Sequence, residues 1–189
     1  MITKVKLLFW LSHLFSKKDT KEEVEMSGTT LCVVDMQPAY PASLEIMKEV
    51  TREIELAKRR GDGIVFLELN PGTNGETHQE LRDAAHAGEY SKIAYASKVS
   101  GDGSHEFVDA AGAAEWFSLK RVRVCGVNRG ACVMDTVRGR VGLISKKVKL
   151  ELAFEATAPG QKTWDGYRED HWEKKSYQHW IDEGILTLR

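Results

Sequence analysis

The chain has 189 residues, of which 42% are hydrophobic and 29% are charged. This length suits a single domain with a sizeable core, and the composition is typical of a soluble globular protein. The formal net charge of −1 excludes a global field that would recruit nucleic acid or an acidic membrane surface. We therefore expect no nucleic acid as a partner, and this charge disfavours a membrane partner.

The three cysteines are too few and too scattered for a disulfide framework, which indicates a reducing compartment and predicts a cytoplasmic protein. Cys32 and Cys125 lie inside apolar runs, so we interpret them as small core residues. Cys132 follows a turn and is the only one of the three with a candidate chemical role.

Residues 1–25 read as an N-terminal extension, and residues 26–189 as the domain. The segment 7–15 is apolar and is followed by Lys17, Lys18 and Lys21. It is shorter than the about 20 apolar residues that span a bilayer. Three readings stay open: a short amphipathic helix that docks on the body or a neighbouring subunit, a membrane-surface anchor, and a non-native leader before a start at Met26.

From Thr29 onward, strand and helix patterns alternate. In chain order we predict strand 31–34, helix 43–60, strand 64–69, helix 79–86, strand 92–97, helix 106–116, strand 122–126, helix 131–141, strand 147–156, helix 164–183 and strand 185–188. In the first helix, Ser43 is a credible N-cap and Gly61 ends the pattern. Such alternation predicts an α/β fold, a three-layer αβα sandwich around a mostly parallel six-stranded Rossmann-like sheet.

Three chemically capable residues lie where predicted strands end. Asp35 closes the run 31–34, Lys98 follows 93–97, and Cys132 follows the run 122–126 at the start of a helix. Ligands of open α/β sheets bind outside the carboxyl ends of the strands. A thiol, a carboxylate and an ammonium group at that edge make a plausible nucleophile, base and electrostatic partner.

Cys132 follows the turn 128–131, so we expect it in the first turn of a helix. Exposed N–H groups and the helix dipole lower a thiol pKa in such a place. The backbone N–H groups of Ala131 and Cys132 can then face an oxyanion. The competing readings are a buried structural cysteine at Cys132, a loop-capping carboxylate at Asp35 and a solvated amine at Lys98.

Two segments carry a resemblance to a known family. The run 33–37, Val-Val-Asp-Met-Gln, is similar to the first-strand signature of the isochorismatase-like cysteine hydrolases, and Tyr40 matches an aromatic that follows it. The run 124–136 resembles their nucleophile segment, with Cys132 at the cysteine. That superfamily includes nicotinamidases, N-carbamoyl amidohydrolases and isochorismatases. Its lysine is matched by Lys98, with Lys92 as the fallback.

The resemblance implies a hydrolase that cleaves a small amide or carbamoyl substrate through a thioester. Cys132 would be the nucleophile, Asp35 the general base and Lys98 the supporting cation. It further implies a cis peptide between Val127 and Asn128, and a homodimer or homotetramer. The residues that we expect to bind substrate are Gln37, Tyr40, Asn70 and Arg129, the last as an anchor for an anionic group, unless it is a surface or subunit contact.

Several positions depart from the family pattern. Pro38 and Ala39 replace the usual Asn-Asp, and Arg129 replaces a common threonine. The stretch 70–78 holds one histidine, His78, and no aspartate, which disfavours a nicotinamidase, so we expect no metal. No dinucleotide fingerprint is present, and we expect no other cofactor. Two rivals remain: a non-catalytic ligand-binding or scaffold member, and an isochorismatase-type vinyl-ether hydrolase that does not use the cysteine.

Overall fold

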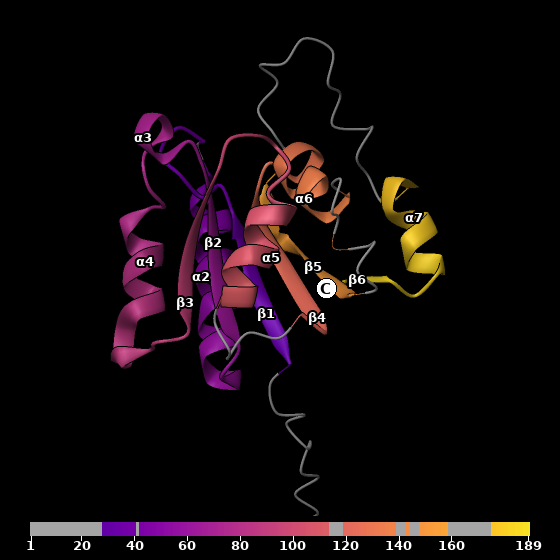
Figure 1. Ribbon diagram of the computed structural model, residues 1–189, viewed down its shortest axis with the longest axis horizontal. Coiled ribbons are helices and arrows are strands. Elements are labelled where there is room, and N and C mark those ends of the chain that lie inside the picture. Colours follow the sequence, from indigo (N-terminus) through magenta and orange to yellow (C-terminus); the bar gives the residue numbers. More distant parts are fainter. Residues whose placement is uncertain (1–27, 41, 114–118, 139–142, 144–147, 159–174) are drawn as a thin grey trace, which may run out of the picture.

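The computed structural model describes residues 28–40, 42–113, 119–138, 143, 148–158 and 175–189 (Figure 1). The predicted extension 1–25 lies outside the described residues. So do residue 147 of the predicted fifth strand and the parts of three predicted helices that fall at 114–116, 139–141 and 164–174. None of the helices within the described ranges is long and apolar enough to cross a membrane.

The described strands form one sheet in the order β3-β2-β1-β4-β5-β6, and every neighbouring pair is parallel. This confirms the predicted α/β class and the six-stranded parallel sheet. The chain fills the sheet outward from β1 in one direction and then outward from β4 in the other, so the topological switch point lies between β1 and β4. The strands are β1 Thr29–Val34, β2 Gly63–Leu69, β3 Ile93–Lys98, β4 Arg121–Val127, β5 Lys149–Ala158 and β6 Leu186–Leu188.

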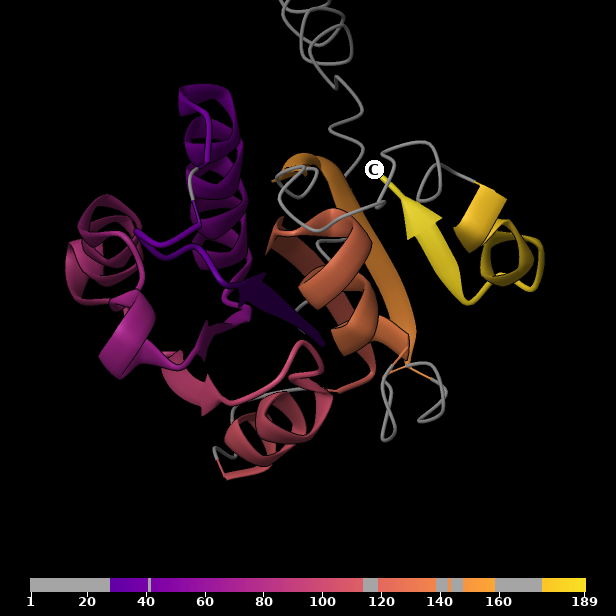
Figure 2. The same cartoon turned by 90° about the horizontal axis from the view of Figure 1, so that it is seen from above.

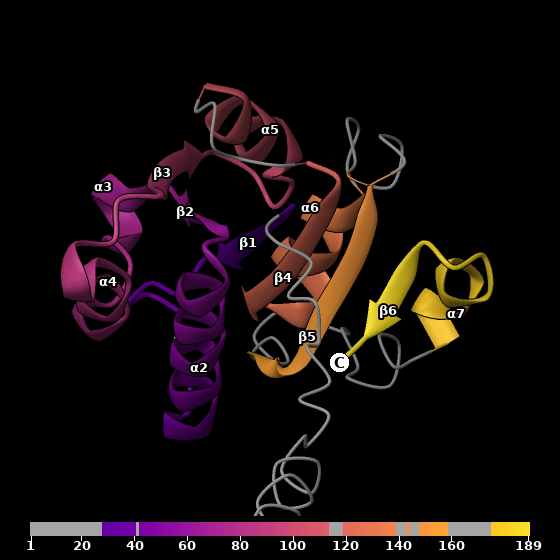
Figure 3. The same ribbon diagram turned by 90° about the horizontal axis from the view of Figure 1, so that it is seen from below.

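Helices cover both faces of the sheet and complete the three layers. Figure 2 shows α2 and α4 on one side of the twisted sheet and α5 and α6 on the other. Figure 3 shows α7 beside the edge strand β6. The described helices are α2 Leu44–Arg60, α3 Pro71–Asn74, α4 Gln79–His86, α5 Ser104–Ala113, α6 Met134–Arg138 and α7 Lys175–Asp182.

Each face of the sheet has its own hydrophobic core. On the α5 and α6 face, Phe107 and Met134 share one core with side chains of the strands. On the α2 and α4 face, Ile54 and Leu81 share a second core with Phe66. Cys32 belongs to the first core and Cys125 to the second, and both are free, fully buried thiols. Their predicted role as core residues is confirmed.

The best-supported predicted helix has the expected ends. The Ser43 hydroxyl accepts from the Ile46 N–H at 3.2 Å, and Gly61 is left-handed at φ 69° with its N–H on the last turn. The sequence missed the short helix α3, which begins at Pro71 after a left-handed Asn70. A proline fits a first helical turn, so Pro71 itself was a sequence signal for the start of this helix.

The predicted helix 131–141 is different in the structure. Residues Arg129–Val133 form a π-helical turn, and the regular helix α6 begins only at Met134. The carbonyl of Asn128 accepts from the Val133 N–H at 3.1 Å, five residues on, which is the defining bond of such a turn. Cys132 therefore lies in a widened turn and not in a regular first turn.

Candidate active site

The carboxyl ends of three strands bring the predicted catalytic side chains together. Asp35 directly follows β1, Lys98 is the last residue of β3, and Cys132 lies five residues beyond the end of β4. The lysine reaches past the end of β2, the strand between β3 and β1, and its Nζ lies 2.8 Å from Asp35 Oδ2. Lys92, the alternative lysine, instead donates to the Gly61 carbonyl at 2.7 Å at the other end of β3.

The ammonium group of Lys98 is fully buried and has a complete set of acceptors. Besides Asp35 it donates to the carbonyls of Ser100 at 3.0 Å and Gly101 at 3.2 Å. An ammonium has three N–H donors, so each has a partner. Gly103 allows this path, because a Cβ there would lie 2.6 Å from Lys98 Cδ.

Asp35 is 1% exposed, and only one of its two carboxylate oxygens binds Lys98. Its backbone is left-handed at φ 50°, and its N–H donates to the Leu67 carbonyl at 2.9 Å. Oδ2 faces Lys98, while no described residue forms a hydrogen bond of ordinary geometry with Oδ1. Burial raises the pKa of Asp35, and the charge of Lys98 opposes that shift.

Cys132 is 7% exposed, and its thiol is near enough to Asp35 for each group to shift the pKa of the other. Burial, followed by the Asp35 carboxylate, raises the pKa of Cys132 to about 12, and Lys98 opposes this. The predicted lowering by a helix start is therefore wrong for the resting site. Desolvation outweighs the dipole of a short, irregular turn, so Cys132 is a protonated thiol at neutral pH, with a carboxylate beside it.

The backbone around Cys132 bears on the expected oxyanion hole. The Val127–Asn128 peptide bond, for which the resemblance implied a cis geometry, is cis. The Ala131 N–H donates to the Asn128 carbonyl at 3.0 Å. Because that donor is engaged within the turn, the Cys132 N–H is the better candidate of the two for an oxyanion.

The expected substrate-binding residues of the first loop differ in their surroundings. Gln37 is fully buried, and its amide bonds the backbone at both ends of the loop that follows β2: it accepts from the Leu69 N–H at 2.8 Å and donates to the carbonyls of Leu69, at 3.2 Å, and Gly75. These bonds favour a role in holding the loop over contact with substrate. Tyr40 lies near Asp35 and Cys132, since burial and then the charges of these two residues raise the pKa of its hydroxyl.

Asn70 is exposed and left-handed at the end of β2, where its N–H donates to the Lys98 carbonyl at 2.9 Å. Sequence reasoning missed Asn74, whose amide donates to Tyr40 Oη at 3.0 Å and to the Leu69 carbonyl at 2.6 Å. Asn74 therefore sets the position of the tyrosine. Its only sequence signal was an asparagine shortly after a Pro-Gly break.

Arg129 occupies the place where the family has a threonine, and its guanidinium binds the protein itself. Its Nε donates to Thr157 Oγ1 at 2.6 Å, and its Nη2 donates to the carbonyls of Phe154, at 3.2 Å, and Thr157. The guanidinium carbon lies 3.8 Å from the centre of the Phe154 ring. Two guanidinium nitrogens of Arg129 thus bind β5, and its expected roles as an anion anchor or as a surface or subunit contact stay predictions.

Two acidic residues near the lysine were also missed. Asp135 follows Cys132 by one helical turn, and burial and then the charge of Asp102 raise its pKa. The charge of Asp135 in turn contributes to the raised pKa of Cys132. Within the described part of the chain, no group of three or more His, Cys, Asp or Glu side chains could hold a metal ion.

The sequence matches no family model and no curated protein. The structure, however, is similar to solved structures. It matches the nicotinamidase SaPncA from Staphylococcus aureus at 16% identity and a TM-score of 0.65, over 87% of this chain and 99% of that one. It matches an isochorismatase-like hydrolase from Alkaliphilus metalliredigens at 16% and 0.60, over 86% and 92%.

A third similar structure is the MAR1 ribonuclease from Caenorhabditis elegans, at 14% identity and a TM-score of 0.64, over 85% of this chain and 76% of that one. At such identities the likeness establishes the fold. The chain thus has the fold of the isochorismatase-like hydrolases, as the sequence resemblance implied.

Proposed function

We propose that this protein is a cysteine hydrolase of a small amide or carbamoyl compound, with Cys132 as nucleophile, Asp35 as general base and Lys98 as the cation that orients the base. The observation that carries this proposal is the buried Lys98–Asp35 pair, 2.8 Å long, beside the Cys132 thiol at the carboxyl ends of the strands. The fold shared with a nicotinamidase and an isochorismatase-like hydrolase supports it.

In the first step the Cys132 proton passes to Asp35 as sulfur bonds to the carbonyl carbon. The carbonyl electron pair moves to oxygen, where the Cys132 N–H can donate to it. The C–N bond then breaks, and the amine leaves with the proton that Asp35 took. Water attacks the resulting thioester with Asp35 again as base, which releases the acid and restores the thiol.

The raised pKa values fit this sequence of steps. A thiol that is protonated at rest needs a base within reach at the moment of attack, and Asp35 Oδ1 has no other described partner. A carboxylate whose pKa is raised is also a stronger base toward the thiol proton. Lys98 keeps the carboxylate in place without moving, since all three of its donors are engaged.

The first test is the release of ammonia or amine from a panel of primary amides and carbamoyl compounds. We expect turnover that disappears in Cys132→Ala and in Asp35→Asn, while both variants keep the wild-type fold by circular dichroism. Turnover of an enol ether that survives in Cys132→Ala would favour the vinyl-ether hydrolase. Absence of turnover, together with a labelling midpoint that neither Asp35→Asn nor Lys98→Ala changes, would favour the ligand-binding or scaffold protein.

The second test needs no substrate. Iodoacetamide labelling of Cys132, mapped by mass spectrometry against pH, should show a midpoint above the free-thiol value of about 8.5. Asp35→Asn should lower that midpoint, because it removes a neighbouring negative charge, and Lys98→Ala should raise it. A midpoint that neither substitution changes would contradict the proposed site.

The homodimer or homotetramer implied by the resemblance remains a prediction, which light scattering tests.

A further inference from the structure

The side chain of Arg129 binds the turn that carries Cys132 to β5. Arg129 is the first residue of the π-helical turn that carries Cys132, and it is three residues away from the sulfur. Its guanidinium binds Thr157 and Phe154, both on β5, and lies against the Phe154 ring. The further inference concerns these contacts and rests on the proposed function of Cys132.

The segment of β5 that Arg129 binds is irregular. Val124 of β4 pairs with Leu152, but Gly126 pairs with Thr157, so four residues of β5 lie opposite Cys125 alone. Carbonyl groups in such a bulge lose their sheet partners. The carbonyls of Phe154 and Thr157 accept from Arg129, and Thr157 Oγ1 also donates to the Phe154 carbonyl at 2.7 Å.

These contacts decide between two roles for the arginine. An anchor for an anionic substrate needs a guanidinium edge directed at the ligand. Here Nε and Nη2 are directed at carbonyl and hydroxyl oxygens of β5, and two of those oxygens belong to the fully buried Thr157. A planar fork that serves several acceptors at once and stacks on a ring is also the geometry that a lysine does not reproduce.

We propose that Arg129 is a positioning residue: it holds the π-helical turn against the β5 bulge, so that the Cys132 thiol stays buried beside Asp35, and it does not bind the substrate's charge. Thr157 and Phe154 are its partners in this role. A site in which the sulfur moves by about 1 Å loses on the order of 100-fold in rate. The contacts of Arg129 with Thr157 and Phe154 prevent such a displacement.

The test compares Arg129→Lys, Arg129→Gln and Thr157→Val with the wild type, and uses Arg52→Gln as the control. Arg52 has an exposed side chain on α2 and contacts only Glu49 among the bonds of the described residues. Cys132 is labelled against pH with iodoacetamide, which is neutral, and with iodoacetate, which is an anion. Amide hydrogen exchange of residues 131–133 is measured in parallel.

We expect Arg129→Lys, Arg129→Gln and Thr157→Val to lower the labelling midpoint of Cys132 toward the free-thiol range, because a loosened turn admits water to the sulfur. The ratio of the iodoacetate rate to the iodoacetamide rate should stay that of the wild type in all three. Exchange at 131–133 should speed up in all three and not in Arg52→Gln. The double variant Arg129→Lys/Thr157→Val should be no worse than the more affected single variant, because one contact is lost in both.

The opposite pattern overturns the proposal. If Arg129→Gln slows iodoacetate alone, and Arg129→Lys keeps the wild-type profile, then Arg129 is a charge anchor. Unchanged exchange at 131–133 also overturns it, as does additivity of Arg129→Lys and Thr157→Val. Failure of the proposed function has a different signature: the labelling midpoint of Cys132 is then the same in Asp35→Asn as in the wild type. The exchange measurement still shows whether Arg129 holds the turn against β5.

Discussion

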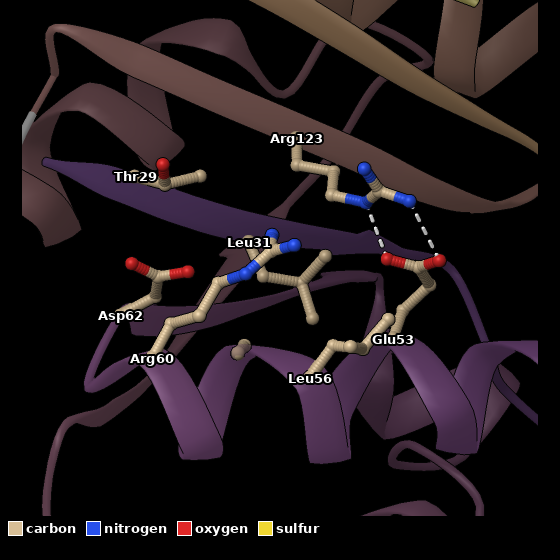
Figure 4. Close-up of a pocket in the computed structure, with 8 residues that line it drawn as sticks. Thr29, Leu31, Glu53, Leu56, Arg60, Asp62 and Arg123 are labelled. Carbon is tan, nitrogen blue, oxygen red and sulfur yellow. Dashed lines mark hydrogen bonds and ion pairs between the residues drawn. The ribbon is translucent and has the colours of Figure 1, made fainter. Parts of the chain in front are cut away.

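Two clusters of charge are buried within the described part of the chain, and they are built differently. One is the Lys98–Asp35 pair at the carboxyl ends of the strands. The other lies between α2 and the sheet, where Arg123 of β4 binds Glu53 and Glu151. Figure 4 shows both carboxylate oxygens of Glu53 paired with the Arg123 guanidinium, beside a small pocket lined by β1 and α2.

The difference lies in what each cluster leaves unpaired. Glu53 bonds Arg123 through both oxygens, and Glu151 uses one oxygen for Arg123 and the other for Arg121 and Arg189. Asp35 uses one oxygen for Lys98, and its other oxygen forms no hydrogen bond of ordinary geometry with a described residue, although hydrogen bonding to the nearby Cys132 thiol lowers the pKa of Asp35. A saturated network resists change of charge, whereas a spare acceptor beside a proton donor favours proton transfer.

The largest effect is expected from Lys98→Met. It leaves a buried carboxylate without its cation, which costs about 3 to 5 kcal/mol of unfolding free energy at neutral pH. The loss should shrink as the pH falls, because Asp35 becomes protonated in the folded state. Urea denaturation at pH 7 and pH 5 measures this. Lys92→Met, at the other end of the same strand, should lose far less; equal losses would mean that burial of Lys98 is unimportant.

Arg123→Met should cost a similar 3 to 5 kcal/mol or somewhat less, about as much as breaking other buried pairs, because two buried carboxylates lose their partner. The labelling profile of Cys132 should not change. The reason is distance: Leu31, which lies on β1 beside this network, is four residues before Asp35 and therefore about 13 Å from it along the strand. Arg121→Met, with 37% of its side chain exposed, should cost under about 1 kcal/mol. A shifted labelling midpoint of Cys132 in Arg123→Met would mean that the two clusters are energetically coupled, contrary to this prediction.

The sequence predicted what depends on short-range pattern. Apolar runs identified every described strand, and the caps at Ser43 and Gly61 bounded α2 to the residue. Asp35 and Lys98 could be placed at one edge because parallel strands end together. The 2.8 Å contact between them is a consequence of that topology, which sequence spacing alone does not measure.

What the sequence did not predict depends on contacts across the sheet. The expected pKa of Cys132 took the turn dipole into account but not the burial. The role of Arg129 depended on the register shift of β5, which brings Phe154 and Thr157 under the guanidinium from about 25 residues along the chain. Gln37 and Asn74 likewise act through partners that only the folded loop supplies.

Gly126→Ala tests the strand that joins the two clusters. Gly126 lies on β4 between Arg123 and the nucleophile turn, at φ 114°, and a Cβ there would lie 2.1 Å from the Val34 carbonyl oxygen. We expect a loss of about 1 to 3 kcal/mol from backbone strain and a displaced Cys132, seen as a changed labelling midpoint. Gly112→Ala is the matched control, because nothing lies near a Cβ at that helical glycine. An unaltered midpoint would mean that the turn is positioned without β4.

The smallest effect is expected at Asp62, which tests whether a spare buried oxygen is enough for reactivity. Asp62 Oδ1 also has no described partner, and burial, opposed by Arg60 and Lys92, raises the pKa of this carboxyl from 3.8 to about 6. No thiol lies among the residues that line its pocket.

Because the folded state binds the proton more tightly than the unfolded state, Asp62 favours folding below about pH 4, and this contribution is lost as the pH rises through about 6. Asp62→Asn should therefore stabilise the protein at pH 7 by on the order of 1 kcal/mol, with no gain at pH 4 and no change in Cys132 labelling. Denaturation at the two pH values checks the sign, and a variant that is less stable at pH 7 would show that the Asp62 charge is paired. If the sign holds, Asp62 and Asp35 differ in the neighbour that each carboxylate has, and the Cys132 thiol beside Asp35 is what supports the proposed role of Asp35 as a base.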